Sequence, residues 1–124
     1  MKLLLPLVLA SVAASLAADS PFACNRMALE PAARKRHFDE LGPALVAAKK
    51  SLRELPTGYE IVLADDPATY KMVSEWVWGE HLCCPFFDID LHYEREGGGL
   101  TLRLTGREGV KAFIRSDFKR MFPQ

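Results

Sequence analysis

The sequence predicts an α+β fold in which helices cover one face of a three-stranded sheet. Three observations lead to this class. Apolar residues recur at helical spacing in the first half of the chain, apolar and polar residues alternate in short segments of the second half, and turn residues separate the two patterns. In chain order the predicted elements read α-β-α-β-β-α.

The first predicted helix begins at Pro31, because proline is tolerated at the first helical position. Its apolar stripe consists of Phe38, Leu41, Leu45, Ala48 and Leu52. Gly42-Pro43 should kink or split the helix, because a proline ring clashes with the carbonyl one turn earlier. The turn residues Pro56-Thr57-Gly58 then end the segment.

The first predicted strand covers residues 59–64. A second helix follows, with Asp66 as its N-cap and Pro67 in its first turn, and it extends to Cys83 or Cys84. Residues 87–94 and 100–104 form two further strands, which flank a glycine turn. The last helix has an apolar side made by Val110, Phe113, Ile114, Phe118 and Met121.

A right-handed crossover between the first two strands leaves a gap that the third strand fills, as in a ferredoxin-like split β-α-β unit followed by a hairpin. The predicted spatial order of the three strands is therefore 1-3-2. Polar residues on the second and third strands predict that the uncovered face is open to water or to a partner, and a homodimer through that open sheet face is one expectation.

Residues 1–18 are typical of a secretory signal peptide, because Lys2 precedes an apolar run over residues 3–16. The run is shorter than the roughly 20 apolar residues that span a bilayer. We expect a single α+β domain over residues 19–124, periplasmic or secreted, with no membrane span after signal cleavage.

The charges and motifs exclude several classes of function. Sixteen basic and sixteen acidic residues give a formal net charge of zero, which argues against nucleic acid as a partner. The sequence contains no Ser/His/Asp arrangement and no nucleotide-binding fingerprint. We therefore assign no catalytic residues and expect a protein that is not an enzyme.

Three cysteines carry the main functional signal. Cys83 and Cys84 are adjacent, Cys24 follows the predicted signal, and an odd number of thiols cannot all pair within one chain. Glu80 lies one helical turn before the pair and falls on the apolar side of its helix. A buried carboxylate needs a partner. Glu80 either pairs with an arginine or caps backbone amides, or it acts together with the two thiols.

Three thiol states are open. Cys24 could form a disulfide with Cys83 or Cys84, the adjacent pair could form a strained vicinal disulfide, or the thiolates could bind a soft metal ion. A resting nucleophile is the least natural state, because Glu80 and the helix C-terminus both disfavour a thiolate. A redox enzyme that cycles the vicinal pair is thus the weakest alternative.

The stretch from Cys24 through Glu80-His81-Leu82-Cys83-Cys84-Pro85-Phe86-Phe87 to the glycine-rich hairpin resembles a family of small, uncharacterised bacterial proteins. The shared mark is a Glu-x-x-Cys-Cys-Pro-Phe segment. The resemblance implies that an early cysteine belongs with the pair, here Cys24, and it suggests heavy-metal handling.

The sequence thus predicts a small exported protein that binds a soft metal ion such as Cu(I), Zn or Hg, or a thiol-reactive ligand. The predicted ligands are Cys24, Cys83, Cys84, Glu80 and His81. The alternative is a non-catalytic structural or interaction module stapled by one disulfide. In that case the cysteines and Glu80 serve the core alone.

Overall fold

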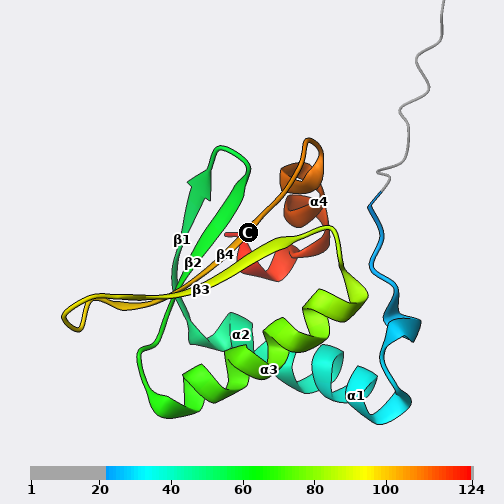
Figure 1. Cartoon of the computed structure of the whole chain (residues 1–124), viewed down its shortest axis with the longest axis horizontal. Coiled ribbons are helices and arrows are strands. Elements are labelled where there is room, and N and C mark those ends of the chain that lie inside the picture. Colours follow the sequence, from blue (N-terminus) through cyan, green and yellow to red (C-terminus); the bar gives the residue numbers. More distant parts are fainter. Residues whose placement is uncertain (1–21, 124) are drawn as a thin grey trace, which may run out of the picture.

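The computed structural model describes residues 22–123 as an antiparallel four-stranded sheet with helices packed against it (Figure 1). The strands are β1 (Lys49–Leu55), β2 (Gly58–Leu63), β3 (Asp88–Glu94) and β4 (Gly99–Thr105). The helical segments are η1 (Arg26–Ala28), α1 (Pro31–Lys35), η2 (Arg36–Leu41), α2 (Gly42–Ala48), α3 (Pro67–Cys83), α4 (Val110–Asp117) and η3 (Lys119–Met121). The predicted signal peptide lies outside the described residues.

The α+β class is confirmed, but the prediction of a three-stranded sheet in the order 1-3-2 is wrong. The sheet has the order β1-β2-β4-β3, and β1 occupies a segment that we expected to be the end of the first helix. Pro56 and Thr57, which we expected to end the first helical segment, form the turn of the β1–β2 hairpin, in which Leu55 pairs with Gly58. The fold therefore begins its sheet one strand earlier than predicted.

The error at β1 has a physical cause. Lys49, Leu52 and Leu55 are half-buried whereas the residues between them are exposed, so burial recurs every third residue as on a helix. The strand lies at the edge of the sheet, and its register shifts between Lys49 and Ser51, which breaks the usual alternation. Periodicity alone cannot separate a helix from a short segment of this kind.

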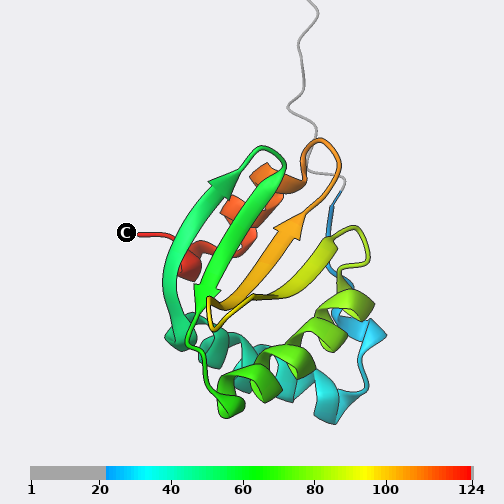
Figure 2. The ribbon, with the colours of Figure 1, turned by 60° about the vertical axis from the view of Figure 1, so that its left-hand side comes forward.

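The helices lie on one side of the twisted sheet (Figures 1 and 2). The covered face carries alternate residues of the two central strands, which are buried: Tyr59, Ile61, Leu63, Leu100, Leu102 and Leu104. Against them pack Val73 and Trp76 of α3 and Phe113 of α4. The core thus forms between the sheet and the α3 and α4 helices.

The other face of the sheet is polar. Glu60 is buried there because Arg53 and Arg103, its neighbours on β1 and β4, lie over it with nitrogen–oxygen distances of 2.6 and 2.5 Å. Along β3, Asp88, Asp90, His92 and Glu94 are exposed. The expectation that this face contacts a second copy of the chain stays a prediction.

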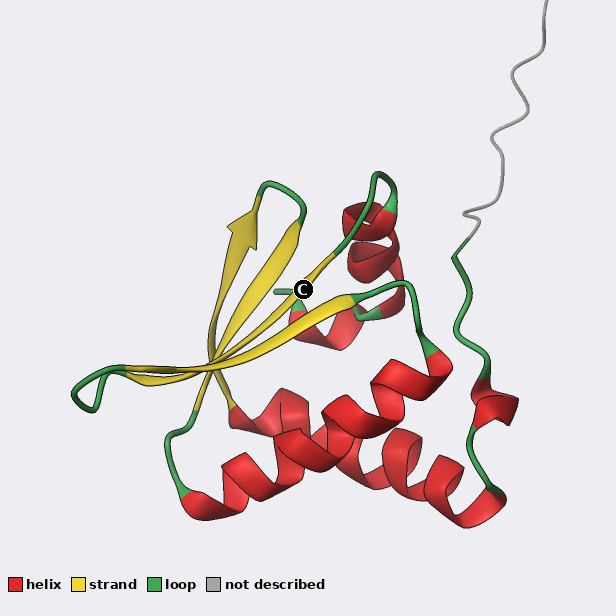
Figure 3. Cartoon of the chain, viewed as in Figure 1, coloured by secondary structure: helices red, strands yellow, loops and turns green. Residues whose placement is uncertain are grey.

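The first helical region runs from Pro31 to Ala48 and widens into a π helix at η2 (Figure 3). Gly42 donates its amide hydrogen to the carbonyl of His37, five residues earlier. Pro43 follows in the first turn of α2. It has no amide hydrogen to donate, and that loss is tolerated at this position. The expected interruption at Gly42-Pro43 therefore takes the form of a widened turn, in which His37 faces α3.

The second helix forms as the sequence predicts. The carboxylate of Asp66 accepts a hydrogen bond from the amide of Thr69 at 2.8 Å, which caps the start of α3. The helix ends at Cys83, and Cys84 has already left helical geometry before Pro85. Within residues 22–123, no helix combines the length and the apolar character that crossing a bilayer requires.

We predict that the contact between β2 and β4 at Gly58 tolerates no side chain. A Cβ atom there would lie 1.9 Å from the Leu104 carbonyl oxygen, so Gly58→Ala should lower the free energy of unfolding by roughly 1–3 kcal/mol. Urea denaturation followed by circular dichroism measures the change. Gly97→Ala is the control: its φ of +74° adds strain but its surroundings are open, and it should cost less. An equal or smaller loss for Gly58→Ala would contradict the packing.

Candidate functional site: a buried thiol, carboxylate and imidazole beside a disulfide

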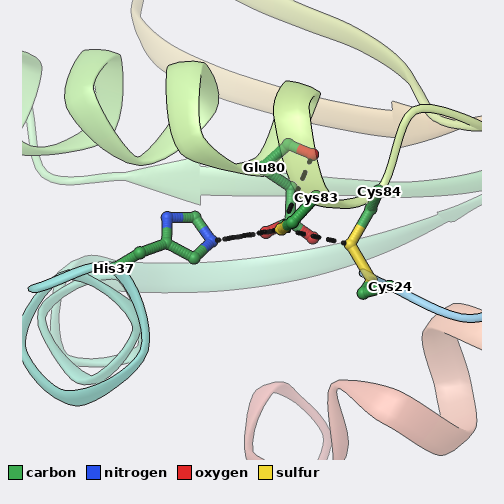
Figure 4. The surroundings of a disulfide bond; sticks show 5 residues. All are labelled: Cys24, His37, Glu80, Cys83 and Cys84. Atoms are coloured by element: carbon green, nitrogen blue, oxygen red, sulfur yellow. Dashed lines mark hydrogen bonds and ion pairs between the residues drawn. A yellow bond between two sulfur atoms is a disulfide. The ribbon is translucent and has the colours of Figure 1, made fainter. Parts of the chain in front are cut away.

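Cys24 and Cys84 are joined in a disulfide, and Cys83 is left as a free, buried thiol (Figure 4). The bridge connects the amino-terminal segment to the end of α3 across a sequence separation of 60 residues. Closing a loop of that size stabilises a fold by about 4 kcal/mol in the chain-entropy model. Of the three thiol states that the sequence left open, the structure has the first, a disulfide from Cys24 to one of the two adjacent cysteines, Cys84.

The amino-terminal segment is held by other contacts as well. The amide of Asn25 donates to the carbonyl of Cys83 at 2.7 Å, and the ring of Phe22 packs 4.9 Å from that of Phe86. The guanidinium of Arg26 lies 3.8 Å from the centre of the Phe38 ring. These contacts fix residues 22–28 against both α3 and the π turn.

Glu80 is 3% exposed and has a partner that the sequence analysis did not identify. His37 Nε2 lies 2.8 Å from Glu80 Oε2, and the two residues are 43 positions apart. The imidazole, also 3% exposed, stacks on the Trp76 ring at 5.7 Å between centroids. The partner of the buried carboxylate is therefore a histidine from the π turn and not an arginine.

Gly79 makes room for this histidine. A Cβ atom at position 79 would lie 2.4 Å from His37 Nδ1, so only a glycine lets the imidazole approach α3 this closely. Nδ1 finds no hydrogen-bond partner among residues 22–123. The ring is consequently oriented by Glu80 on one side and by Trp76 stacking.

Cys83 completes a group of three donor atoms. Its Sγ lies 3.8 Å from Glu80 Oε2 and 3.9 Å from His37 Nε2. The sulfur, nitrogen and oxygen all lie within 4.8 Å of one another, and all three residues are buried. The ligand atoms of Cys24, Glu80 and Cys84 form a second group in which all lie within 4.8 Å of one another. Glu80 therefore belongs to both groups.

Burial sets the electrostatics of this site. It raises the pKa of Glu80 above its usual range, while the hydrogen bond from His37 acts in the opposite direction. Burial and the nearby Glu80 carboxylate raise the pKa of the Cys83 thiol to about 12. Without a cation, the thiol keeps its proton, and its environment opposes nucleophilic catalysis.

His81 lies outside the cluster. Its side chain is exposed, and its ring centre is 6.1 Å from that of Trp78 on the solvent side of α3. Of the five ligands that the sequence predicts, the structure brings together Cys24, Cys83, Cys84 and Glu80, whereas His37 takes the place of His81. A helical glycine next to Glu80 was the available signal for His37, because such a glycine often marks a close approach by another segment.

We predict that Gly79→Ala disrupts the histidine–carboxylate contact. Helix propensity alone would favour alanine by about 0.5–1 kcal/mol, but the clash with His37 should instead destabilise the fold by roughly 1–3 kcal/mol. Thermal unfolding of the variant shows whether the substitution raises or lowers the stability of the fold. A stabilised variant would show that the imidazole does not lie against α3.

A second prediction concerns the reactivity of Cys83. A pKa near 12 leaves roughly one thiol in ten thousand ionised at pH 8, so the native protein should resist iodoacetamide. In guanidinium chloride without reductant, mass spectrometry should find a single label, on Cys83, because Cys24 and Cys84 remain joined. Rapid labelling of the native protein, or a label on Cys24 or Cys84, would contradict the arrangement.

Comparisons with known proteins add no relative from which a function could be transferred. The chain matches no model of a protein family, no curated protein and no solved structure. The resemblance noted from the Glu-x-x-Cys-Cys-Pro-Phe segment therefore stays a prediction.

Proposed function

We propose that the protein binds one thiophilic metal ion through Cys83, His37 and Glu80. The observation that carries this proposal is the convergence of three different donor atoms, a sulfur, a nitrogen and an oxygen, within 4.8 Å in the protein interior. Sulfur with nitrogen ligands suits Zn(II), Cu(I) and Hg(II) better than hard cations such as Mg(II).

The distances fit a tetrahedral ion with little movement. Bonds of about 2.3 Å to sulfur and 2.0 Å to nitrogen or oxygen separate neighbouring ligand atoms by roughly 3.3–3.5 Å. The separations of Cys83 Sγ from Glu80 Oε2 and His37 Nε2 are 3.8 and 3.9 Å, and that between Nε2 and Oε2 is 2.8 Å. Shifts of about half an ångström would place all three atoms around one ion.

A cation would also remove the electrostatic cost of the site. Burial disfavours the anionic forms of both Glu80 and Cys83, and the Glu80 carboxylate further disfavours the Cys83 thiolate. A coordinated ion replaces the thiol proton, and its positive charge compensates the thiolate and the carboxylate together. The Glu80 carboxylate and the Cys83 thiolate, whose charges are unfavourable in the interior, would then be neutralised by the ion that they bind.

A groove at the surface borders the imidazole side of the site. The groove of about 250 Å³ is bordered by η1, the π turn and α3, and its lining includes His37, Gly79 and Leu82. Trp78 borders the same groove and is 66% exposed. Because the groove reaches His37, we propose that an ion enters on the side of the imidazole.

The Cys24–Cys84 bridge supports a periplasmic or secreted location, because disulfides persist in oxidising compartments. The same bridge favours a second candidate function, a non-catalytic structural or interaction module that uses the disulfide as its staple. In that case the hydrogen bond between His37 and Glu80 serves only to satisfy a buried carboxylate. A homodimer through the polar sheet face belongs to this second candidate.

Native mass spectrometry of the disulfide-bonded chain with Zn(II), Cu(I) and Hg(II) tests the proposal. We expect one bound ion per chain for at least one of the three metals. Cys83→Ser and His37→Ala should each weaken binding by more than the roughly 100-fold that the loss of an outer-sphere partner can cost.

His81→Ala is the matched control, because that imidazole is exposed and lies outside the cluster. It should bind as the unaltered chain does. If the unaltered chain retained none of the three ions, or if Cys83→Ser retained them equally well, the metal site would be refuted and the structural module favoured.

A further inference from the structure

The disulfide lies directly beside the proposed metal ligands (Figure 4). Cys84 Sγ is 3.6 Å from Cys83 Sγ, and both Cys84 and Cys24 lie in a group within 4.8 Å that includes a Glu80 oxygen. Two thiolates on one tetrahedral zinc ion are about 3.8 Å apart, given bonds of about 2.3 Å. Cys84 therefore stands where a further ligand would be needed, but its sulfur is engaged in the bridge.

We propose that the Cys24–Cys84 disulfide is a redox switch for this site: its reduction by a dithiol releases Cys84 as an additional metal ligand beside Cys83. The inference rests on the proposed function and adds to it the regulation of the site. It would account for the 3.6 Å between the free thiol and the bridge.

The difference in exposure indicates how reduction proceeds. Cys24 is half-buried, whereas Cys84 is 1% exposed, so a dithiol reaches the sulfur of Cys24 first. One thiolate of the dithiol bonds to Cys24 Sγ, the bond to Cys84 Sγ breaks, and Cys84 leaves as the thiolate. The second thiol of the dithiol then attacks the mixed disulfide and frees Cys24. Two electrons and two protons pass to the protein, and the dithiol becomes a disulfide.

Reduction should increase the affinity for the ion. A sulfur in a disulfide carries no negative charge, whereas a thiolate is the ligand that soft ions select. The ligand set changes from one thiolate, one imidazole and one carboxylate to a set with a second thiolate from Cys84. Since thiolates neutralise a divalent ion in the interior, the reduced form should bind it more tightly.

The site can survive the opening of the bridge, because other contacts hold its parts. The amide of Cys84 donates to the carbonyl of Glu80 at 2.8 Å, and the amide of Asn25 donates to Cys83 at 2.7 Å. The Phe22 ring packs against those of Phe86 and Phe113, at 4.9 and 6.4 Å. Cys84 therefore stays next to Cys83 after its sulfur is released.

The test compares zinc affinity of the full chain with and without a phosphine reductant, against a competing chelator. We expect the reduced chain to bind zinc at least about 100-fold more tightly than the disulfide-bonded chain. By linkage, saturating zinc should move the midpoint potential of the disulfide by about 60 mV to less negative values. The midpoint is measured in a glutathione redox buffer, so this readout needs no substitution.

Two variants form a matched pair, because each loses the same staple. Cys24→Ser leaves Cys84 as a permanent free thiol and should bind zinc without reductant as tightly as the reduced chain. Cys84→Ser removes the released ligand and should bind no more tightly than the disulfide-bonded chain, with or without reductant.

Equal affinities of the reduced and disulfide-bonded chains, or of the two variants, would overturn the switch. The proposed function would still stand if the disulfide-bonded chain bound zinc through Cys83. Failure of the disulfide-bonded chain to bind zinc, Cu(I) or Hg(II) would instead refute the proposed function, and the switch that rests on it.

Discussion

The buried contact between Glu80 and His37 is the interaction on which the arrangement of the site depends. A carboxylate in the apolar side of α3 is costly unless it has a partner, and the imidazole provides one from a segment 43 residues earlier. The contact requires three local features at once. The π turn directs His37 towards α3, Gly79 leaves space for its ring, and Trp76 stacks on it. The first helical region is thereby fixed to the helix that carries the cysteines.

The proposed binding of a cation also depends on this contact. The interior holds two groups that can be anions, and it brings an imidazole nitrogen close to both of them. A purely structural hydrogen bond would not need a thiol 3.8 Å from the carboxylate, because a small apolar residue would fill the same space at no electrostatic cost. Under the proposed function, the thiol instead supplies the sulfur ligand of the ion.

Much of the site could be predicted from the sequence, because it depends on spacing within one helix. Glu80 and Cys83 are three residues apart on the apolar side of α3, and this determines that they are neighbours. The position of Cys24 could be proposed only from the odd cysteine count and the resemblance. His37 could not be found from its own surroundings, which are charged, since its orientation depends on packing against a glycine far away in the chain. Its position one turn before Leu41 of the apolar stripe was a weaker indication.

The fold was harder to predict where tertiary pairing overrides local pattern. An edge strand with a shifted register shows the burial spacing of a helix, so β1 could be recognised only through its partner β2. By contrast, β3 and β4 alternate regularly around a glycine turn, and their elements were predicted closely. Local patterns therefore sufficed for the β3–β4 hairpin and for α3, but not for β1 at the opposite edge of the sheet.

The two adjacent cysteines have different roles because the helix ends between them. Cys83 is the last helical residue, and its side chain joins Glu80 on the inner side of α3. Cys84 adopts φ −126° and ψ 68°, a conformation outside the helix that is favoured by the following Pro85, and its sulfur meets Cys24. Because Pro85 ends the helix between the two cysteines, Cys83 stays a buried thiol while Cys84 forms the disulfide. The sulfurs of Cys83 and Cys84 are nevertheless 3.6 Å apart.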